Sequence, residues 1–202
     1  MDKNVPATPP KIAVVGSYGA GLTMRVPRVP VAGETLSGGV YSPGPGGKGS
    51  NQAIGAARLG ADVTFLTAIG DDDLGQGGRR LWQQENVDAT SVVTIDGVST
   101  MAGFIMVEPS GENRIIIAAG ALDHLEPVHV ETFRPQLTAA DLVVVSLEIP
   151  VPAALAALQF VASTSSNRDD RHGRRRDRTD RRTPEPDKRT GLVPCRFTAT
   201  GQ

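Results

Sequence analysis

Short apolar runs alternate with helix-like stretches through most of this chain of 202 residues. The runs are rich in β-branched residues and end at polar or glycine positions, as strands buried on both faces do. They cover residues 11–17, 62–69 and 141–147. The stretches with the spacing or composition of helices cover residues 50–59, 74–85 and 152–161. Strands that alternate with helices predict an α/β fold, in which helices cover a parallel sheet.

A second kind of segment alternates apolar and polar residues and indicates a separate, smaller sheet. Thr35–Tyr41, Met101–Glu108 and Asn113–Ala118 have this pattern, and the tight polar turn Pro109–Glu112 joins the last two. These features predict an antiparallel hairpin with one partner strand.

The charge is distributed so unevenly that it divides the chain in two. Residues 1–162 carry 10 basic and 16 acidic side chains, whereas residues 163–202 carry 11 basic and 6 acidic ones. The second segment has too few apolar residues to offset the entropy of ordering it, so we expect it to be disordered. Two origins stay open for this Arg/Asp-rich tail: out-of-frame translation of a GC-rich gene, or a basic tail that binds nucleic acid. Interleaved acids and a single aromatic residue, Phe197, disfavour the second, so no nucleic-acid partner is expected.

Composition excludes several classes of protein. No apolar run approaches the roughly 20 residues that a membrane span needs, and the N-terminus lacks the pattern of a signal peptide. A cytoplasmic protein without a membrane partner is therefore predicted. The single cysteine, Cys195, excludes an internal disulfide framework and a cysteine-based zinc cluster, and the three histidines have no metal-ligand or triad spacing.

The glycine-rich stretch 46–53 (GGKGSNQA) is the main candidate for chemistry. Glycine permits unusual dihedral angles and a close approach of the backbone to a ligand, and a predicted helix follows at once. Lys48 and Asn51 then offer donors and an acceptor suited to neighbouring hydroxyl groups. Neither 43–50 (PGPGGKGS) nor 16–21 (GSYGAG) has the spacing of a P-loop or of a dinucleotide-binding turn. A glycine-rich turn that merely packs is the structural alternative.

Two further features have simpler structural interpretations. Asp71, Asp72 and Asp73 are consecutive and point in different directions, which favours helix capping over a metal cluster. Trp82 is expected to anchor its helix in the core rather than to stack on a ligand.

The order of these motifs resembles the N-terminal signature of the ribokinase family, the phosphofructokinase-B type of carbohydrate kinases. In that signature the GGKGSNQA stretch is followed at fixed intervals by Gly60 and Gly70. The similarity runs from about Lys11 to about Val161, the N-terminal half of such a kinase. Shorter similar pieces follow in the right order, at 30–38 (PVAGETLSG), 70–75 (GDDDLG), 99–103 (STMAG), 111–114 (GENR) and 146–150 (SLEIP).

The resemblance implies a ribokinase-like α/β fold over residues 1–162, with a β-sheet lid formed by residues of about 35–44 and 99–118. It also implies transfer of the ATP γ-phosphoryl group to a primary hydroxyl of ribose or a related sugar with Mg²⁺, and a homodimer formed through the lid. Glu148 lies just after a predicted parallel strand, where α/β folds bind ligands. By matching position, the sugar-binding residues are Gly47, Lys48, Gly49, Ser50, Asn51 and Glu148.

The chain departs from the family pattern in two respects. Gly19 and Gly21 stand where ribokinases have an asparagine and an aspartate that hold the sugar, so ribose, another sugar and a nucleoside all stay open. The G-A-G-D segment, which supplies the family's catalytic base, does not occur, and neither does the site for ATP and magnesium. The C-terminal half of the fold is therefore expected to be absent. The prediction is a truncated kinase, inactive alone; the alternative is a non-catalytic remnant that binds a sugar or dimerises.

Overall fold

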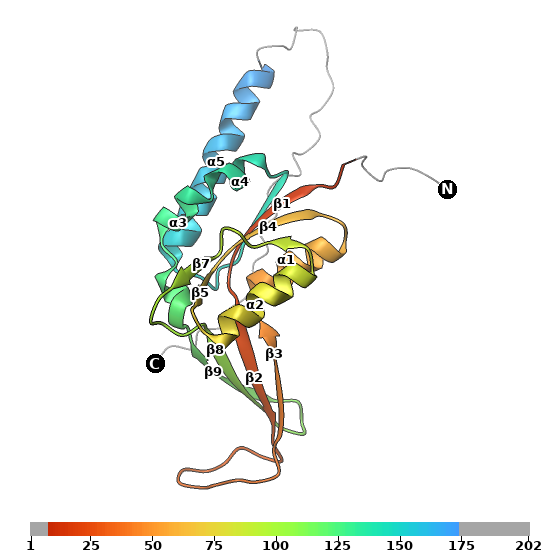
Figure 1. Ribbon diagram of the computed structural model, residues 1–202, viewed down its shortest axis with the longest axis vertical. Coiled ribbons are helices and arrows are strands. Elements are labelled where there is room, and N and C mark those ends of the chain that lie inside the picture. Colours follow the sequence, from red (N-terminus) through yellow and green to blue (C-terminus); the bar gives the residue numbers. More distant parts are fainter. Residues whose placement is uncertain (1–7, 174–202) are drawn as a thin grey trace, which may run out of the picture.

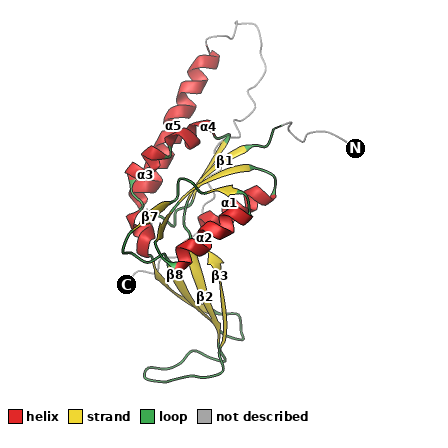
Figure 2. Cartoon of the chain, viewed as in Figure 1, coloured by secondary structure: helices red, strands yellow, loops and turns green. Residues whose placement is uncertain are grey.

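A four-stranded parallel sheet forms the centre of this computed structural model, which describes residues 8–173 (Figures 1 and 2). The strands lie in the order β10–β1–β4–β6. They are β1 (Lys11–Val15), β4 (Asp62–Leu66), β6 (Val87–Asp88) and β10 (Leu142–Val145). Because β1 pairs in parallel with both β4 and β10, the three predicted apolar runs form neighbouring strands. The predicted parallel sheet is confirmed.

Helices cover both faces of this sheet, because alternate residues of a buried strand point to opposite sides. On one face Val14 packs in a cluster with Ala53 and Trp82, whereas on the other Ala13 and Val15 join a second cluster. The helices of the first face are α1 (Lys48–Arg58) and α2 (Asp73–Gln84). Those of the second are α3 (Pro127–Thr132), α4 (Arg134–Ala139) and α5 (Val151–Gly173).

The apolar run predicted as one strand over 62–69 is divided in two. Its first part forms β4, and its end forms β5 (Ala68–Gly70), which pairs in parallel with β7 (Val93–Ile95) in a separate sheet. A short 3₁₀ helix, η1 (Gly120–His124), leads from the small sheet back towards α3.

The small sheet has four strands in the order β3–β2–β8–β9 and extends away from the larger layer (Figure 1). Its strands are β2 (Gly19–Arg25), β3 (Val40–Gly46), β8 (Ala102–Val107) and β9 (Asn113–Ala118). The predicted antiparallel hairpin is confirmed as β8 and β9.

One strand of the small sheet was predicted at the wrong place, and another was missed. The strand expected at 35–41 lies at β3, whose two prolines are tolerated because β3 is an edge strand. The central strand β2 was not predicted at all, since its sequence, GAGLTMR, has two glycines and no alternation. Glycine is depleted in strands, so pairing with the neighbours on both sides decides its conformation.

The boundary predicted after residue 162 falls inside α5. The helix packs through Ala153, Ala154 and Ala157, and it continues to Gly173 beyond the body of the molecule (Figure 1). A helix satisfies its backbone hydrogen bonds locally, so it does not need buried side chains over its whole length. The described helix thus continues past the predicted boundary, residues 174–202 lie outside the described residues, and the expected disorder of the tail stays a prediction.

Both structural interpretations of the acidic triplet and the tryptophan are confirmed. Asp72 caps α2, because its side chain accepts a hydrogen bond from the Gly75 amide at 2.8 Å. Trp82 is fully buried and meets the rings of Tyr18 and Phe65 edge to face.

Candidate functional site

Three polar side chains meet where β1 and β10 end and α1 begins. Ser17 follows β1, Glu148 follows β10, and Lys48 is the first residue of α1. The Lys48 Nζ atom lies 2.5 Å from Oε1 of Glu148. The other carboxylate oxygen accepts hydrogen bonds from the Ser17 hydroxyl at 2.9 Å and from the Lys48 amide at 3.3 Å. The carboxyl ends of parallel strands, where α/β folds bind ligands, therefore carry a charged and partly exposed group of side chains.

Glycines bring the start of α1 close enough to β1 for these contacts. Gly47 has a φ of 92°, and a Cβ there would lie 2.6 Å from Cα of Tyr18. A Cβ on Gly49 would likewise stand 2.6 Å from the backbone of Gly16. Larger residues at these two positions would push α1 away from β1 and separate Lys48 from Glu148.

Glu148 is ionised at neutral pH in this environment. Burial raises the pKa of its carboxyl group, but hydrogen bonds from Lys48 and Ser17 outweigh burial and hold the pKa below the ordinary value of 4.5. The carboxylate accepts hydrogen bonds, and the ammonium group beside it donates them. Two neighbouring sugar hydroxyls, each able to donate and to accept, can bind both groups at once.

The structure brings together only some of the predicted sugar-binding residues. Gly47 and Lys48 lie beside Glu148, and Asn51 is exposed on the first turn of α1. Gly49 and Ser50 are buried, and the Ser50 hydroxyl accepts a hydrogen bond from the Trp82 indole at 2.8 Å. The side chain of Ser50 thus serves core packing.

Ser17 is the site residue that the sequence interpretation missed. It lies at the carboxyl end of a predicted strand, as Glu148 does, so the same positional argument would have found it. Its hydroxyl donates to Glu148, and its carbonyl accepts from the Ser50 amide at 2.9 Å.

The first turn of α1 is not a phosphate cradle. Its leading amides donate to Glu148, to the Ser17 hydroxyl at 3.4 Å and to the Ser17 carbonyl at 2.9 Å, so the groups that would hold a phosphate already have partners. The glycine-rich residues 16–21 lead into strand β2 and not into a helix. The residues around these two turns therefore do not offer the free amides that a nucleotide phosphate would need.

Residues 8–173 contain neither a metal-binding cluster nor a membrane-spanning helix. No group of three or more histidine, cysteine, aspartate or glutamate side chains in this range is placed to hold a metal ion. Within it, no helix is both long and apolar enough to cross a membrane.

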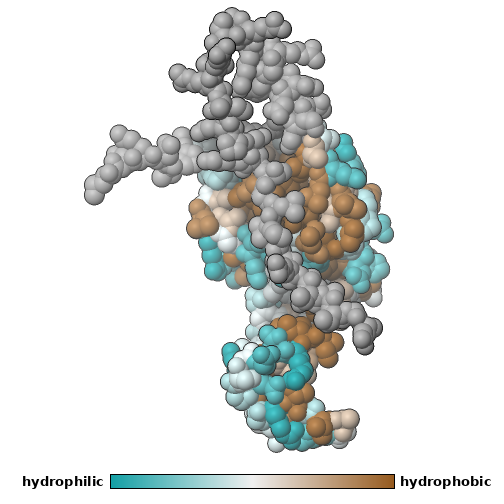
Figure 3. All heavy atoms as spheres, turned by 180° about the vertical axis from the view of Figure 1, so that it is seen from behind, coloured by the Kyte–Doolittle hydropathy of each residue, from teal (hydrophilic) through white to brown (hydrophobic). Residues whose placement is uncertain are grey.

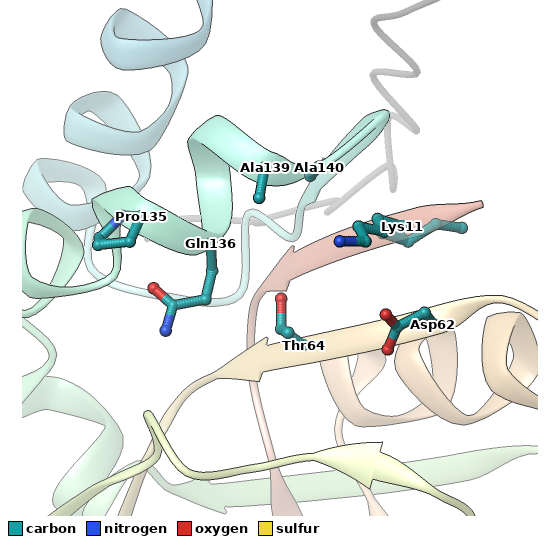
Figure 4. A pocket seen from close by; sticks show the side chains of 8 residues that line it. Lys11, Asp62, Thr64, Pro135, Gln136, Ala139 and Ala140 are labelled. Atoms are coloured by element: carbon teal, nitrogen blue, oxygen red, sulfur yellow. The ribbon is translucent and has the colours of Figure 1, made fainter. Parts of the chain in front are cut away.

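A separate cavity of about 250 Å³ lies at the opposite end of the strands (Figure 4). Lys11 at the start of β1, Asp62 at the start of β4 and Gln136 of α4 line it. Because ligands of α/β folds bind at the carboxyl ends of strands, this cavity is not the candidate site.

Comparison with known proteins shows the family of the chain. Residues 9–180 match the pfkB family carbohydrate kinases. The chain belongs to this family. Ribokinase of Haemophilus influenzae is 38% identical over 149 residues, which are 74% of this chain and 49% of the relative. Deoxyribokinase of Salmonella typhimurium is 32% identical over the same shares of the two chains.

The fold is also that of solved ribokinase structures. Arabidopsis thaliana ribokinase, solved with ribose and ATP, superposes with a TM-score of 0.72 and 26% identity, over 78% of this chain and 52% of the other. The predicted ribokinase-like fold is confirmed, and this member of the pfkB family spans about half the length of the curated relatives that it matches.

Proposed function

We propose that this chain forms the sugar-binding part of a ribokinase-type kinase, which transfers the γ-phosphoryl group of ATP to a primary hydroxyl of ribose or a related sugar. The Lys48–Glu148 pair at the carboxyl ends of β1 and β10 carries the proposal. Membership of the pfkB family and the presence of ribose and ATP in the Arabidopsis structure support it.

In the proposed site, Lys48 and Glu148 bind neighbouring sugar hydroxyls through the ammonium group and the carboxylate. Asn51, which is exposed on the first turn of α1, adds a side-chain amide to these hydrogen-bonding groups. The positive φ of Gly47 lets the backbone approach the sugar without a side chain between them. These residues orient the acceptor hydroxyl, which is a main contribution of an enzyme to phosphoryl transfer.

The phosphoryl-transferring groups belong, in this proposal, to the half of the relatives that the chain does not cover. The sequence has no G-A-G-D segment for the catalytic base, and the turns around α1 do not fit a nucleotide. The chain alone is thus expected to bind the sugar and to leave it unphosphorylated. The second interpretation of the sequence, a non-catalytic remnant that binds a sugar or dimerises, is not favoured over descent from a sugar kinase, because the family match covers most of the chain.

Isothermal titration with D-ribose, with and without ATP and Mg²⁺, tests both parts of the proposal. Ribose should bind, ATP should neither bind nor change the affinity for ribose, and a coupled assay should detect no ADP. Absence of ribose binding contradicts the proposed site. ADP release that depends on ribose contradicts the assignment of catalysis to the other half.

We also propose that a second copy of the chain covers one face of the small sheet. By strand register, Met24, Tyr41, Phe104 and Ile116 share this face, and the last three side chains are exposed. Seen from behind, the small sheet shows apolar residues among polar ones (Figure 3). Light scattering during size exclusion should give a dimer, and Ile116→Asp should give a monomer; a wild-type monomer contradicts this part of the proposal.

A further inference from the structure

The Ser17 hydroxyl joins the candidate site to the start of α1. Ser17 is fully buried, and its hydroxyl donates to Oε2 of Glu148 at 2.9 Å and accepts a hydrogen bond from the Gly49 amide at 3.4 Å. A hydroxyl group has a single proton, so Ser17 gives its proton to Glu148. Because Ser17 has no exposed surface, it acts on a ligand of the site through Glu148 and not by contact.

The two carboxylate oxygens of Glu148 have different neighbours. Oε2 accepts from the Ser17 hydroxyl and from the Lys48 amide, so it lies against the backbone at the start of α1. Oε1 lies beside Nζ of Lys48, and both of these side chains are partly exposed. The last torsion of a glutamate side chain is soft and roughly two-fold. The hydrogen bond from Ser17 therefore selects the orientation in which Oε1 faces the Lys48 ammonium group.

Helix α1 receives its N-terminal caps from other parts of the chain. Its N-cap residue is a glycine, which has no side chain to accept a hydrogen bond. Glu148 accepts from the Lys48 amide instead. Ser17 accepts from the Gly49 amide through its hydroxyl and from the Ser50 amide through its carbonyl. A carboxylate is also favourable at this end of a helix dipole. The contacts that cap α1 thus also set the position of Lys48 relative to Glu148.

We infer that Ser17 is a positioning residue of the sugar site: its hydroxyl fixes the Glu148 carboxylate so that Oε1, beside the Lys48 ammonium group, meets the sugar hydroxyls. The inference rests on the proposed function and adds to it a residue that the sugar does not touch. Without the Ser17 hydroxyl, Oε2 loses a donor and the carboxylate is able to turn. The sugar must then order this side chain on binding, which lowers the affinity.

The same hydrogen bond helps to keep Glu148 ionised. Burial raises the pKa of its carboxyl group, and hydrogen bonds from Lys48 and then from Ser17 lower it by more. Lys48 of α1 is also the charged group that faces the carboxylate. Loss of the Ser17 hydroxyl should raise the pKa of Glu148, because one of the contacts that favour the charged form is removed. Ribose binding, which uses the carboxylate as an acceptor, should then weaken at a higher pH than in the wild type.

Thr100 makes the same two kinds of hydrogen bond at the N-terminus of α2, and it provides a matched control. Its buried hydroxyl accepts from the Gly70 amide at 2.9 Å and donates to Oδ1 of Asp72 at 2.6 Å. Thr100→Val removes this hydroxyl and keeps the size of the side chain. Ser17→Ala and Thr100→Val therefore lose equivalent buried hydrogen bonds, but the lost donor served Glu148 in the first variant and Asp72 in the second.

The test is isothermal titration of the full chain with D-ribose, at neutral pH and at successively lower pH, with melting curves to establish that each variant is folded. Ser17→Ala should weaken binding at neutral pH by about five- to tenfold, and its affinity should fall at a higher pH than that of the wild type. Ser17→Cys, whose thiol is a weak donor, should change in the same direction. Thr100→Val should keep the wild-type pH profile and a Kd within about twofold of the wild type.

A folded Ser17→Ala with the wild-type affinity overturns the inference. An unchanged pH profile in a weakened Ser17→Ala also overturns it, as does an equal loss of affinity in Thr100→Val, because the loss would then follow from the fold and not from Glu148. If Ser17→Ala does not fold, Ser17→Cys decides by the same criteria. If the wild type binds no ribose, the proposed function itself fails and the inference falls with it, so the two failures have different signatures.

Discussion

Lys48 and Glu148 are 100 residues apart in the sequence, yet Nζ of one lies 2.5 Å from Oε1 of the other. The contact joins the first turn of α1 to the segment that follows β10. Both side chains are partly exposed, 38% for Lys48 and 21% for Glu148, so the pair is accessible to a ligand and adds little to stability. Its position at the carboxyl ends of the parallel strands, and not its exposure alone, makes this pair the candidate binding site.

The first prediction is that Glu148→Gln weakens ribose binding by tenfold or more but lowers the free energy of unfolding by only about 1 kcal/mol. The amide keeps the shape and loses the charge that holds the Lys48 ammonium group in place. Titration gives the Kd and urea unfolding gives the stability.

Glu108→Gln is the matched control for that variant. Glu108 pairs with Arg114 at 2.6 Å near the end of the β8–β9 hairpin, so the same change is made in an ion pair outside the site. Equal losses of affinity in the two variants would show that Glu148 has no special part in binding.

The second prediction concerns acid. Because the folded-state pKa of Glu148 is lowered from 4.5, its ionised form stabilises the fold above this pH, and this contribution is lost as the pH falls through the lower folded-state value. The difference in melting temperature between wild type and Glu148→Gln should therefore be constant above about pH 5 and shrink below pH 4.5. If the difference in melting temperature grew as the pH falls, folding would raise the pKa of Glu148 instead of lowering it.

How far the sequence predicts this molecule depends on which kind of interaction fixes each part. The parallel strands were found because Val14, Val15 and Phe65 stand in continuous apolar runs, a local signal. Strand β2 was missed because its partners, not its own residues, make it a strand: Gly21 pairs with Gly44 and with Gly103, which follows it by about eighty residues. The end of α5 was predicted too early, because a helix can continue beyond the residues through which it packs on the rest of the protein.

The site divides in the same way. Lys48 and Glu148 were predicted from a motif and from a strand end, and the structure adds that they form a pair. The motif could not predict that the Ser50 side chain is buried, because its hydrogen-bond partner, Trp82, belongs to another helix. The filling of the space at Gly19 by Met101 is likewise a non-local packing detail.

The third prediction is that Asp72→Ala lowers the free energy of unfolding by about 1–3 kcal/mol. Asp72 caps α2 and also accepts hydrogen bonds from the amide of Thr100 at 2.8 Å and from its hydroxyl at 2.6 Å. Thr100 is buried, so its amide would lose its partner in a dry environment. Asp71→Ala, at the exposed neighbour, should cost less than about 0.5 kcal/mol in the same urea titration. Similar costs for the two variants would contradict the capping role.

The fourth prediction compares two glycines of α1, at which the same substitution should have opposite effects. Alanine normally favours a helix over glycine by about 0.5–1 kcal/mol. At Gly55, which is exposed and has no atom within 4 Å of an added Cβ, Gly55→Ala should stabilise the protein by that amount. At Gly49 the Cβ would stand 2.6 Å from Gly16, so Gly49→Ala should destabilise by about 2 kcal/mol or more, because backbone must move.

The fluorescence of the single tryptophan, Trp82, reports unfolding of both alanine variants in urea, since the residue is fully buried. Gly49→Ala should also weaken ribose binding, because a displaced α1 carries Lys48 away from Glu148, whereas Gly55→Ala should bind as the wild type does. If Gly49→Ala were as stable as Gly55→Ala, the close packing of α1 on β1 would not be what fixes the site.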